Sequence, residues 1–434
     1  MAYGGGLWLP PIQNKIMPGT YMHFSSKARP TNIFGERGYV AFAIELPWGA
    51  TDDLITVEPS DLQKESMELF GLEYTDKRLM PLREALKHAK VAHIYRLNGG
   101  GAKATGTEGT LNVESKYQGT GGNDISVVVS NNLEDESKFD VVIKKSDVKV
   151  YDKIAVTNAG ELNSNPYVVF KGTLQATAGI TLKGGTDGEV TAKSHTDFLG
   201  KLERKDFNIL AYAGKDEAIK KLYISYVERR VNLEGAYFQL VLHDASANSE
   251  LVIRVGKEQD NNIVYWVAGK EAGCEINQSV SSTIYDGELK PYVAYKQRDL
   301  VKAIESGDFV FHEVDGKARV LADINTFTDF SVRKNEDFAQ NQVIRVLHQV
   351  ANDWSTIFNT RYLDKELNDD LGRTALWNDF HNHLLKLQGA RAITNVEEKD
   401  IVVEPGEAKN AVYALAKIQP ILVMNKLYTE VVVA

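Results

Sequence analysis

Two glycine-rich segments divide this chain of 434 residues: NGGGAKATG begins at residue 98, and KGGTDGEVT begins at residue 183. Between them lie short β-branched runs such as DISVVVS, FDVVIKK and PYVVFKG, separated by Gly, Asn and Thr turns. No run in this stretch has the periodicity of a helix, and short strands at this spacing predict a β-sandwich or a small barrel. An all-β block with a glycine hinge at each end predicts an inserted domain at residues 98–189.

The regions on either side of this block mix strands and helices. In residues 190–330, strands such as DFNILAYAG and YFQLVLH alternate with helical patterns such as KDEAIKKLYISYVERRVN, which predicts an α/β domain with a largely parallel sheet. Residues 25–97 contain the strands YVAFAIELPWG and VAHIYRL and are expected to form the N-terminal part of the core. Between these strands, Ser60 and Gln63 have the spacing of a capping box, and Pro81 suits the first position of a helix.

The pattern of residues 331–424 predicts a C-terminal α+β domain. Glu336 and Asp337 suit the first turn of a helix, and a second helix is expected after Thr374, with Gly389 as its C-terminal stop. The strand-like runs ARAITNV, DIVVEPG and NAVYALAKIQP follow. The apolar stripe of the first helix has 3.6-residue spacing and consists of Val343, Val346, Leu347, Val350, Trp354, Ile357 and Phe358.

The two ends of the chain are predicted to be arms. Residues 1–24 combine a flexible GGG, a stiff PP and the strand-like MPGTYMHF after a Pro-Gly turn. Residues 425–434, NKLYTEVVVA, read as an apolar strand with alternate side chains on opposite faces. No turn, charged tail or covering helix follows this strand in the sequence, so we expect its edge to pair with another chain.

The composition is that of a globular protein with an acidic balance: 43% of the residues are hydrophobic, and the formal net charge is −9. There is no basic stripe of the kind that binds duplex nucleic acid, and the charge disfavours an anionic membrane surface. Cys274 is the one cysteine, which excludes an intrachain disulfide and fits a reducing cytoplasm. The start MAYGGGLWLPPIQNK lacks the features of a signal peptide, and no apolar run approaches the ~18 residues of a membrane span. We expect a cytoplasmic product without membrane insertion or direct nucleic-acid contact.

The sequence offers little evidence of a metal or cofactor site. HNH at residues 381–383 would place His381 and His383 on different sides of a helix, so they could not share a metal, and we interpret them as polar residues beside a core stripe. GTGGNDIS, with Asn123 and Asp124, has too few carboxylates for calcium and reads as a tight turn. No phosphate-binding P-loop is present. We therefore predict no metal and no cofactor.

A catalytic nucleophile is also hard to find. There is no G-x-S-x-G elbow, and Cys274, in an apolar helical context, reads as a packing residue. His243 with Asp244, or His195 with Asp197, could contribute to a serine triad, but triads are recognised by geometry rather than by sequence. The weak signals together predict that the protein has no catalytic residues.

Several motifs in this chain resemble, in the same order, those of contractile phage tail sheath proteins, which occur in myophages, PBSX-like prophages, R-type bacteriocins and related injection systems. The resemblance covers nearly the whole chain, and its size and organisation are most similar to the short sheath proteins of Gram-positive prophages and of clostridial phages or tail-like bacteriocins. The motifs are NKIMPGTYMHF, GTGGNDI, LKGGTDGEVTAKSHTDFLGKLERKDFNILAY, NQVIRVLHQVANDWSTIFNTRYL, LNDDLGRTALWNDFHNHLLKLQGARAI and IQPILVMNKLYTEVVV.

The resemblance implies an architecture and an assembly. It implies a subtilisin-like fold for the middle α/β domain, without protease activity, and an outward-projecting inserted β domain. The C-terminal α+β domain would lie against the inner tail tube, and six subunits would form each ring of a helical stack. Baseplate and tail terminator proteins are the other expected partners. The expected location is the tail of a phage or of a phage-tail-like particle assembled in the bacterial cytoplasm.

The resemblance also implies that both arms add strands to sheets of neighbouring subunits. By position, the exchanged segments would be residues 16–24 and 427–433. Contraction would then be a rigid-body rotation of subunits that gain interface area while the arms keep them connected. The residues expected to carry the strand exchange are Ile16, Tyr21, Met22, Phe24, Leu427, Tyr428, Val431 and Val433.

Three other classes stay open at this point. The α/β domain could belong to an enzyme such as a serine hydrolase. A different structural tail or capsid protein, such as a tube subunit, is disfavoured by the length of the chain and by the inserted domain. An adhesive surface protein is disfavoured by the lack of an export signal.

Overall fold

The computed structural model of the chain describes residues 4–7, 19–22 and 35–433. These residues belong to two compact units, Met1–Glu36 and Arg37–Ala434. No helix in the described part of the chain is both long and apolar enough to cross a bilayer.

The described residues of the first unit include one pair of strands. Strand β1 (Gly4–Leu7) and strand β2 (Gly19–Met22) are parallel, with Gly4 opposite Gly19 and Leu7 opposite Met22. The strand predicted after the Pro-Gly turn therefore forms. Two residues predicted to exchange with neighbouring subunits, Ile16 and Phe24, lie outside the described residues.

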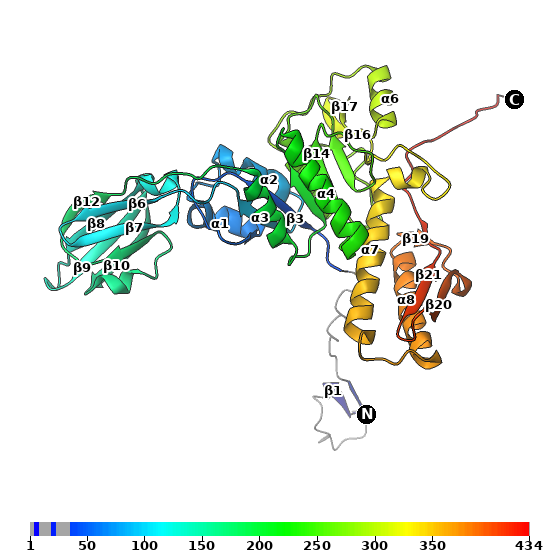
Figure 1. The fold of residues 1–434 in the computed structure, drawn as a ribbon, viewed down its shortest axis with the longest axis horizontal. Coiled ribbons are helices and arrows are strands. Elements are labelled where there is room, and N and C mark those ends of the chain that lie inside the picture. The colour runs from blue at the N-terminus through cyan, green and yellow to red at the C-terminus, as the bar shows by residue number, and fades with distance from the viewer. Residues whose placement is uncertain (1–3, 8–18, 23–34, 434) are drawn as a thin grey trace. The chain divides into compact units, whose positions relative to one another are not determined.

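The second unit is organised around a seven-stranded sheet (Figure 1). Five of the six strand pairings are parallel, and only β4 runs antiparallel to its neighbour β5. This confirms a largely parallel α/β sheet, which takes strands from both sides of the inserted block. In spatial order the strands are β16 (Asp308–Phe309), β15 (Val252–Val255), β14 (Gln239–His243), β13 (Ile209–Tyr212), β3 (Tyr39–Ile44), β5 (Val91–Arg96) and β4 (Ile55–Val57).

Both faces of this sheet are covered, which explains why its strands are almost continuously apolar. In β3, Val40, Phe42 and Ile44 belong to one buried cluster, whereas Ala41 and Ala43 belong to another. The first cluster includes residues of α1 (Pro59–Phe70), α2 (Met80–Leu86) and α5 (Ile263–Gly273), and the second includes residues of α3 (Ala192–Leu202) and α4 (Glu217–Glu234). Near the edge strand β16 lie α6 (Gln297–Glu305) and the hairpin of β17 (Phe311–Val314) and β18 (Lys317–Val320).

The inserted block is a β-sandwich, as its sequence predicts. Its sheets are antiparallel, and alternate side chains such as Val127 and Val129 fill the space between them. The four-stranded sheet has the order β10 (Val148–Val156), β9 (Phe139–Lys145), β8 (Ile125–Asn131) and β12 (Thr177–Thr181), and the three-stranded sheet has the order β11 (Val168–Lys171), β7 (Leu111–Gln118) and β6 (Lys103–Glu108).

The C-terminal domain combines two long helices with short antiparallel strand pairs, which agrees with the α+β prediction. The predicted stripe is only partly buried: Val343, Val346 and Val350 are buried, whereas Leu347 and Trp354 are half-buried. Its elements are α7 (Asn341–Ile357), a π-helical turn (Phe358–Tyr362), α8 (Asp370–Gly389), β19 (Ile393–Thr394) paired with β22 (Gln419–Pro420), and β20 (Ile401–Pro405) paired with β21 (Val412–Ala416).

Several helix boundaries differ from the sequence predictions. Helix α1 begins at Pro59 and is capped by Glu58, whose amide donates to Asp61 at 3.1 Å, rather than by Ser60 and Gln63. The cause is Pro59, which is favoured in the first helical turn and shifts the cap one residue upstream.

The two C-terminal helices also begin elsewhere than predicted. Helix α8 begins at Asp370, because the Asp369 carboxylate accepts from the amide of Gly372 at 2.9 Å, and Gly389 is still helical. Glu336 and Asp337 lie in a separate 3-10 turn before α7. The other 3-10 turns are Lys77–Leu79, Thr120–Asp124, Ala159–Leu162 and Glu398–Asp400.

Candidate functional site

The last described residues, 421–433, adopt no helix or strand. The segment is first attached to α7, because Gln342 donates to the carbonyl of Ile421 at 2.9 Å and accepts from the amide of Val423 at 3.3 Å. The segment then extends away from the C-terminal domain (Figure 1). Six of its large apolar side chains each expose 80% or more of their surface: Met424, Leu427, Tyr428, Val431, Val432 and Val433.

Four of these six residues are the predicted C-terminal arm residues Leu427, Tyr428, Val431 and Val433. The sequence predicts a strand at 425–434, and none forms over the described residues 425–433. A strand needs a neighbouring edge to pair its backbone amide and carbonyl groups, and this segment pairs with no such edge among the residues that the structure describes. A contiguous exposed apolar run marks an interaction site.

The hairpin of β20 and β21 offers an open sheet edge in the same domain. Its two strands are paired from Ile401 opposite Ala416 to Pro405 opposite Val412. It packs on α8, where the indole N–H of Trp377 donates to the carbonyl of Ile401 at 2.9 Å. Tyr413 and Leu415 remain exposed on β21. A two-stranded sheet is marginal by itself, and its edges can accept a further strand.

The N-terminal arm residues Tyr21 and Met22 lie in β2. There they are opposite Gly6 and Leu7 of β1, in the first compact unit. Half of the four predicted N-terminal arm positions are thus described, and their strand already pairs on one side within its own chain.

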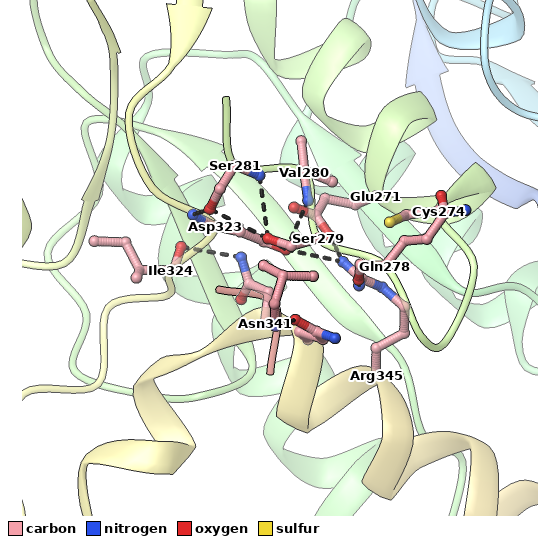
Figure 2. A network of polar contacts seen from close by, with 12 residues as sticks. Glu271, Cys274, Gln278, Ser279, Val280, Ser281, Asp323, Ile324, Asn341 and Arg345 are labelled. Carbon is pink, nitrogen blue, oxygen red and sulfur yellow. Dashed lines mark hydrogen bonds and ion pairs between the residues drawn. The ribbon is translucent and has the colours of Figure 1, made fainter. Parts of the chain in front are cut away.

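A buried ionic cluster joins the α/β domain to the C-terminal domain (Figure 2), and no motif in the sequence predicts it. Arg345 of α7 places Nη2 2.5 Å from Oε2 of Glu271, at the end of α5, and 3.4 Å from Oδ2 of Asp323, in the loop after β18. Its Nη1 donates to the carbonyl of Gln278 at 2.8 Å. The three charged side chains are at most 2% exposed.

Asp323 is held from several directions in this cluster (Figure 2). Its Oδ2 accepts from the hydroxyl of Ser279 at 3.1 Å and from the amide of Val280 at 3.0 Å. Its own backbone amide donates to the hydroxyl of Ser281 at 2.9 Å, and its carbonyl accepts from the amide of Asn341 at 3.1 Å. The first residue of α7 and the loop between α5 and α6 therefore meet at this one aspartate.

A second junction connects the sandwich to the α/β domain. The buried guanidinium of Arg96 donates to the carbonyls of Gln118 (2.7 Å) and Gly49 (3.2 Å) and to the carboxylate of Asp187 (3.1 Å). Asp187 also accepts from the hydroxyl of Thr120 at 2.7 Å. The glycine-rich connections expected to act as hinges are therefore fixed by hydrogen bonds.

Trp48 and Lys145 complete this second junction. Trp48 follows β3 of the α/β sheet, yet its ring lies in the sandwich core. The Lys145 ammonium lies 4.6 Å from the centre of this ring and donates to the carbonyl of Gly121. Burial lowers the pKa of Lys145 to about 8.

The residues considered for chemistry have structural partners. His243 bonds the carbonyl of Gln259 at 2.9 Å, and His195 bonds the hydroxyl of Tyr223 at 3.1 Å. Cys274 is buried directly after α5, and burial raises the pKa of its thiol to about 11. His383, interpreted above as a residue beside the core, is itself buried and bonds Asp353. Among the described residues, no three His, Cys, Asp or Glu side chains are grouped to hold a metal.

The fold and these interfaces define a multidomain protein with an inserted β-sandwich and an exposed apolar segment. Four family models match it in succession. They are the tail sheath protein Gp18 domain III N-terminal region (37–97), the phage tail sheath protein beta-sandwich domain (99–187), the phage tail sheath protein central domain (188–326) and the phage tail sheath C-terminal domain (333–434).

Individual proteins agree with these matches. The Phage-like element PBSX protein XkdK of Bacillus subtilis is 29% identical, over 96% of this chain and 97% of that protein. The solved sheath tail protein of Desulfitobacterium hafniense is 34% identical with a TM-score of 0.80, over 93% of this chain and 96% of that one. The solved sheath tail protein of Listeria innocua is 30% identical with a TM-score of 0.79, over 89% of this chain and 92% of that one.

The chain belongs to the family of contractile phage tail sheath proteins, as its motifs predict. This is a family of structural proteins. More distant structures share the fold alone: the helical sheath of the anti-feeding prophage, solved in its contracted state, is 12% identical with a TM-score of 0.53, over 96% of this chain and 99% of that one.

Proposed function

We propose that this protein is the subunit of a contractile sheath that polymerises as stacked hexameric rings around a tail tube and contracts to drive the tube through a cell envelope. The observation that carries the proposal is the exposed apolar segment 424–433, which has no strand partner among the described residues of its own chain. In a member of the sheath family, a second copy of the chain is the natural partner for such a segment.

Strand exchange explains how this segment would be covered. The open edge of the β20–β21 hairpin would accept the segment from a neighbouring subunit, and main-chain hydrogen bonds would provide affinity. Each large aliphatic side chain that becomes buried, such as Leu427, Val431 or Val433, would contribute about 1.5–3 kcal/mol. The contact is head-to-tail and need not close on itself, so it generates an open helical polymer.

The N-terminal arm would take part in the same mesh. Strand β2 pairs with β1 in its own unit, and its second edge would receive a strand from a neighbour. Tyr21 and Met22, with Ile16 and Phe24 beside them in sequence, would then contribute side chains to that interface.

Contraction would be a rearrangement of whole subunits. The extended sheath would be a kinetic trap templated on the tube, and opening of the baseplate would release it. Subunits would rotate as near-rigid bodies and gain contact area while the arms keep them connected. The same proposal includes a subtilisin-like fold for the middle domain, a tail terminator protein as a partner and assembly in the host cytoplasm. The proposed domain limits are residues 25–97, 98–189, 190–330 and 331–424.

Deletion of residues 427–434 tests the proposal. We expect the truncated protein to fold and remain monomeric, whereas the full-length protein assembles into tubes visible by negative-stain electron microscopy. Circular dichroism should be unchanged, because the deleted residues make no strand or helix over their described part.

A point-mutation pair makes this test sharper. Val431→Asp should prevent tube formation, because the proposed interface would bury the new charge. Leu133→Asp is the matched control, since Leu133 is 98% exposed on the sandwich and should not affect assembly. Normal tubes from Val431→Asp and from the deletion would contradict the arm mechanism.

A further inference from the structure

The ionic cluster at Arg345 contains more buried acid than one guanidinium balances. Glu271 and Asp323 both approach the same Nη2 atom, and both carboxyl groups are almost completely shielded from water. Oε1 of Glu271 and Oδ1 of Asp323 are buried, and neither accepts a hydrogen bond from any described residue. Two unbonded carboxylate oxygens in one closed site would be strongly unfavourable.

The second arginine of this region does not correct the imbalance. Arg37 donates to backbone carbonyls, to that of Cys274 at 3.1 Å and to that of Glu271 at 3.2 Å. The carboxyl groups of Glu271 and Asp323, by contrast, both contact Nη2 of Arg345, and each carboxyl group affects the pKa of the other. A single proton between them would satisfy both oxygens and leave one negative charge opposite Arg345.

We propose that Glu271 and Asp323 share one proton, and that this acid–carboxylate pair with Arg345 is a pH-sensitive lock between the α/β domain and helix α7. The lock joins three segments far apart in the chain, namely the end of α5, the loop after β18 and the first turns of α7. It is a property of the single subunit and does not depend on the proposed sheath function.

The electrostatics of the pair agree with its geometry. Burial, together with the neighbouring Asp323 charge, raises the pKa of Glu271 to about 8. Burial is the largest single influence on the pKa of Asp323 and acts to raise it, but the Arg345 charge and the hydrogen bonds to this carboxylate together lower that pKa overall. The proton therefore resides mainly on Glu271. Among the described residues, Arg37 and Cys274 also face the cluster, and Glu275 and His348 in turn interact with Arg37.

The direction of the pH effect follows from linkage. Because the pKa of Glu271 is higher in the folded than in the unfolded state, its proton stabilises the fold fully below the unfolded pKa, and this contribution is lost as the pH rises to about 8. Between the pKa of Glu271 in the unfolded chain and its folded value of about 8, the ratio of folded to unfolded protein should fall with rising pH by up to about tenfold per pH unit. A variant in which residue 271 does not titrate should lack this fall.

Glu271→Gln, which keeps a hydrogen-bond donor beside Asp323, tests the proposal. Urea midpoints between pH 5 and 9 should decline with pH in the wild type and remain flatter in the variant, while buried histidines affect both proteins equally. Glu275→Gln is the matched control, since Glu275 is exposed next to the cluster and should follow the wild type. Parallel curves for the wild type and Glu271→Gln would overturn the proposal.

Infrared spectroscopy provides a readout that does not depend on the variant folding. The wild type at pH 6 should show the carbonyl stretch of a buried carboxylic acid, and this band should disappear by pH 9. Hydrogen exchange of the α7 amides, corrected for the intrinsic rate, should be faster at pH 9 than at pH 6. Absence of the acid band at pH 6 would overturn the shared proton, and α7 exchange that does not change with pH would overturn the lock.

Discussion

His383 is a single side chain that connects two helices through both of its ring nitrogens. The indole N–H of Trp354 lies 3.2 Å from Nδ1, and Oδ2 of Asp353 lies 2.8 Å from Nε2. An indole nitrogen can only donate, so Nδ1 must accept and Nε2 carries the proton that is donated to Asp353. The residue is buried, and its two partners lie on α7 while it lies on α8.

Replacing His383 with Leu should destabilise the fold without creating a large cavity. The change leaves the Asp353 carboxylate with fewer donors and removes the acceptor of Trp354. We expect the free energy of unfolding to decrease by about 2–5 kcal/mol, measured by urea denaturation. Asn382→Ala, at the exposed neighbouring position, should change it by less than about 0.5 kcal/mol. Equal effects of the two substitutions would contradict the role of His383.

Helix α5 packs unusually closely on α2 and the turn that follows it. A Cβ atom added to Gly269 would lie 2.1 Å from the carbonyl oxygen of Ala85, and one added to Gly273 would lie 2.1 Å from that of His88. The two glycines are four residues apart and therefore lie on the same face of α5. Close packing of this kind requires backbone, not a side chain, at both positions.

Two glycine-to-alanine substitutions in helices should have opposite effects. Gly269→Ala should lower the free energy of unfolding by about 1–3 kcal/mol, because the helices must separate. Gly200→Ala, in exposed α3 with no atom within 4 Å of the added Cβ, should raise it by about 0.5–1 kcal/mol through helix propensity. Thermal unfolding of both variants checks the signs, and a stabilised Gly269→Ala would contradict the close approach.

The sandwich enters and leaves the α/β domain at one place. The amide of Gly188 donates to the carbonyl of Asn98 at 3.1 Å, and the amide of Thr186 donates to that of Ala102 at 3.1 Å. Because the two connections are adjacent, the intervening residues can be removed without displacing the sheet strands on either side. Trp48 is the part of the α/β domain that would lose its buried environment.

Replacement of residues 99–187 by a short Gly-Ser linker, with Trp48→Ser, should therefore leave a folded α/β and C-terminal core. The separate fragment 99–187 should show a β-type circular dichroism spectrum and unfold cooperatively. Calorimetry of the shortened core and of the fragment 99–187 measures whether each protein unfolds cooperatively. Failure of the excised core and of the fragment to fold would show that the sandwich is not an independent insertion.

Local periodicity explains which parts of the architecture could be read in advance. The β-branched runs of the sandwich, the alternating strands and helices of 190–330 and the stripe of α7 are repeats within one segment, so neighbouring residues suffice to recognise them. Helix ends are harder to predict, because neighbouring residues can each suit the first turn of a helix. Helix α1 begins at Pro59 although Ser60 also suits a cap, and α8 is capped by Asp369 rather than beginning after Thr374. The ordered motifs identified the family.

The long-range contacts could not be read in this way. In the sequence, nothing distinguishes Glu271, Asp323 and Arg345 from charged residues at the surface. Only the fold buries their side chains together in one site. The insertion also conceals that β3 and β13 are neighbours in one sheet. The segment 425–433 has the pattern of a strand, but a strand forms only where another backbone pairs with it, and no described residue of this chain does so.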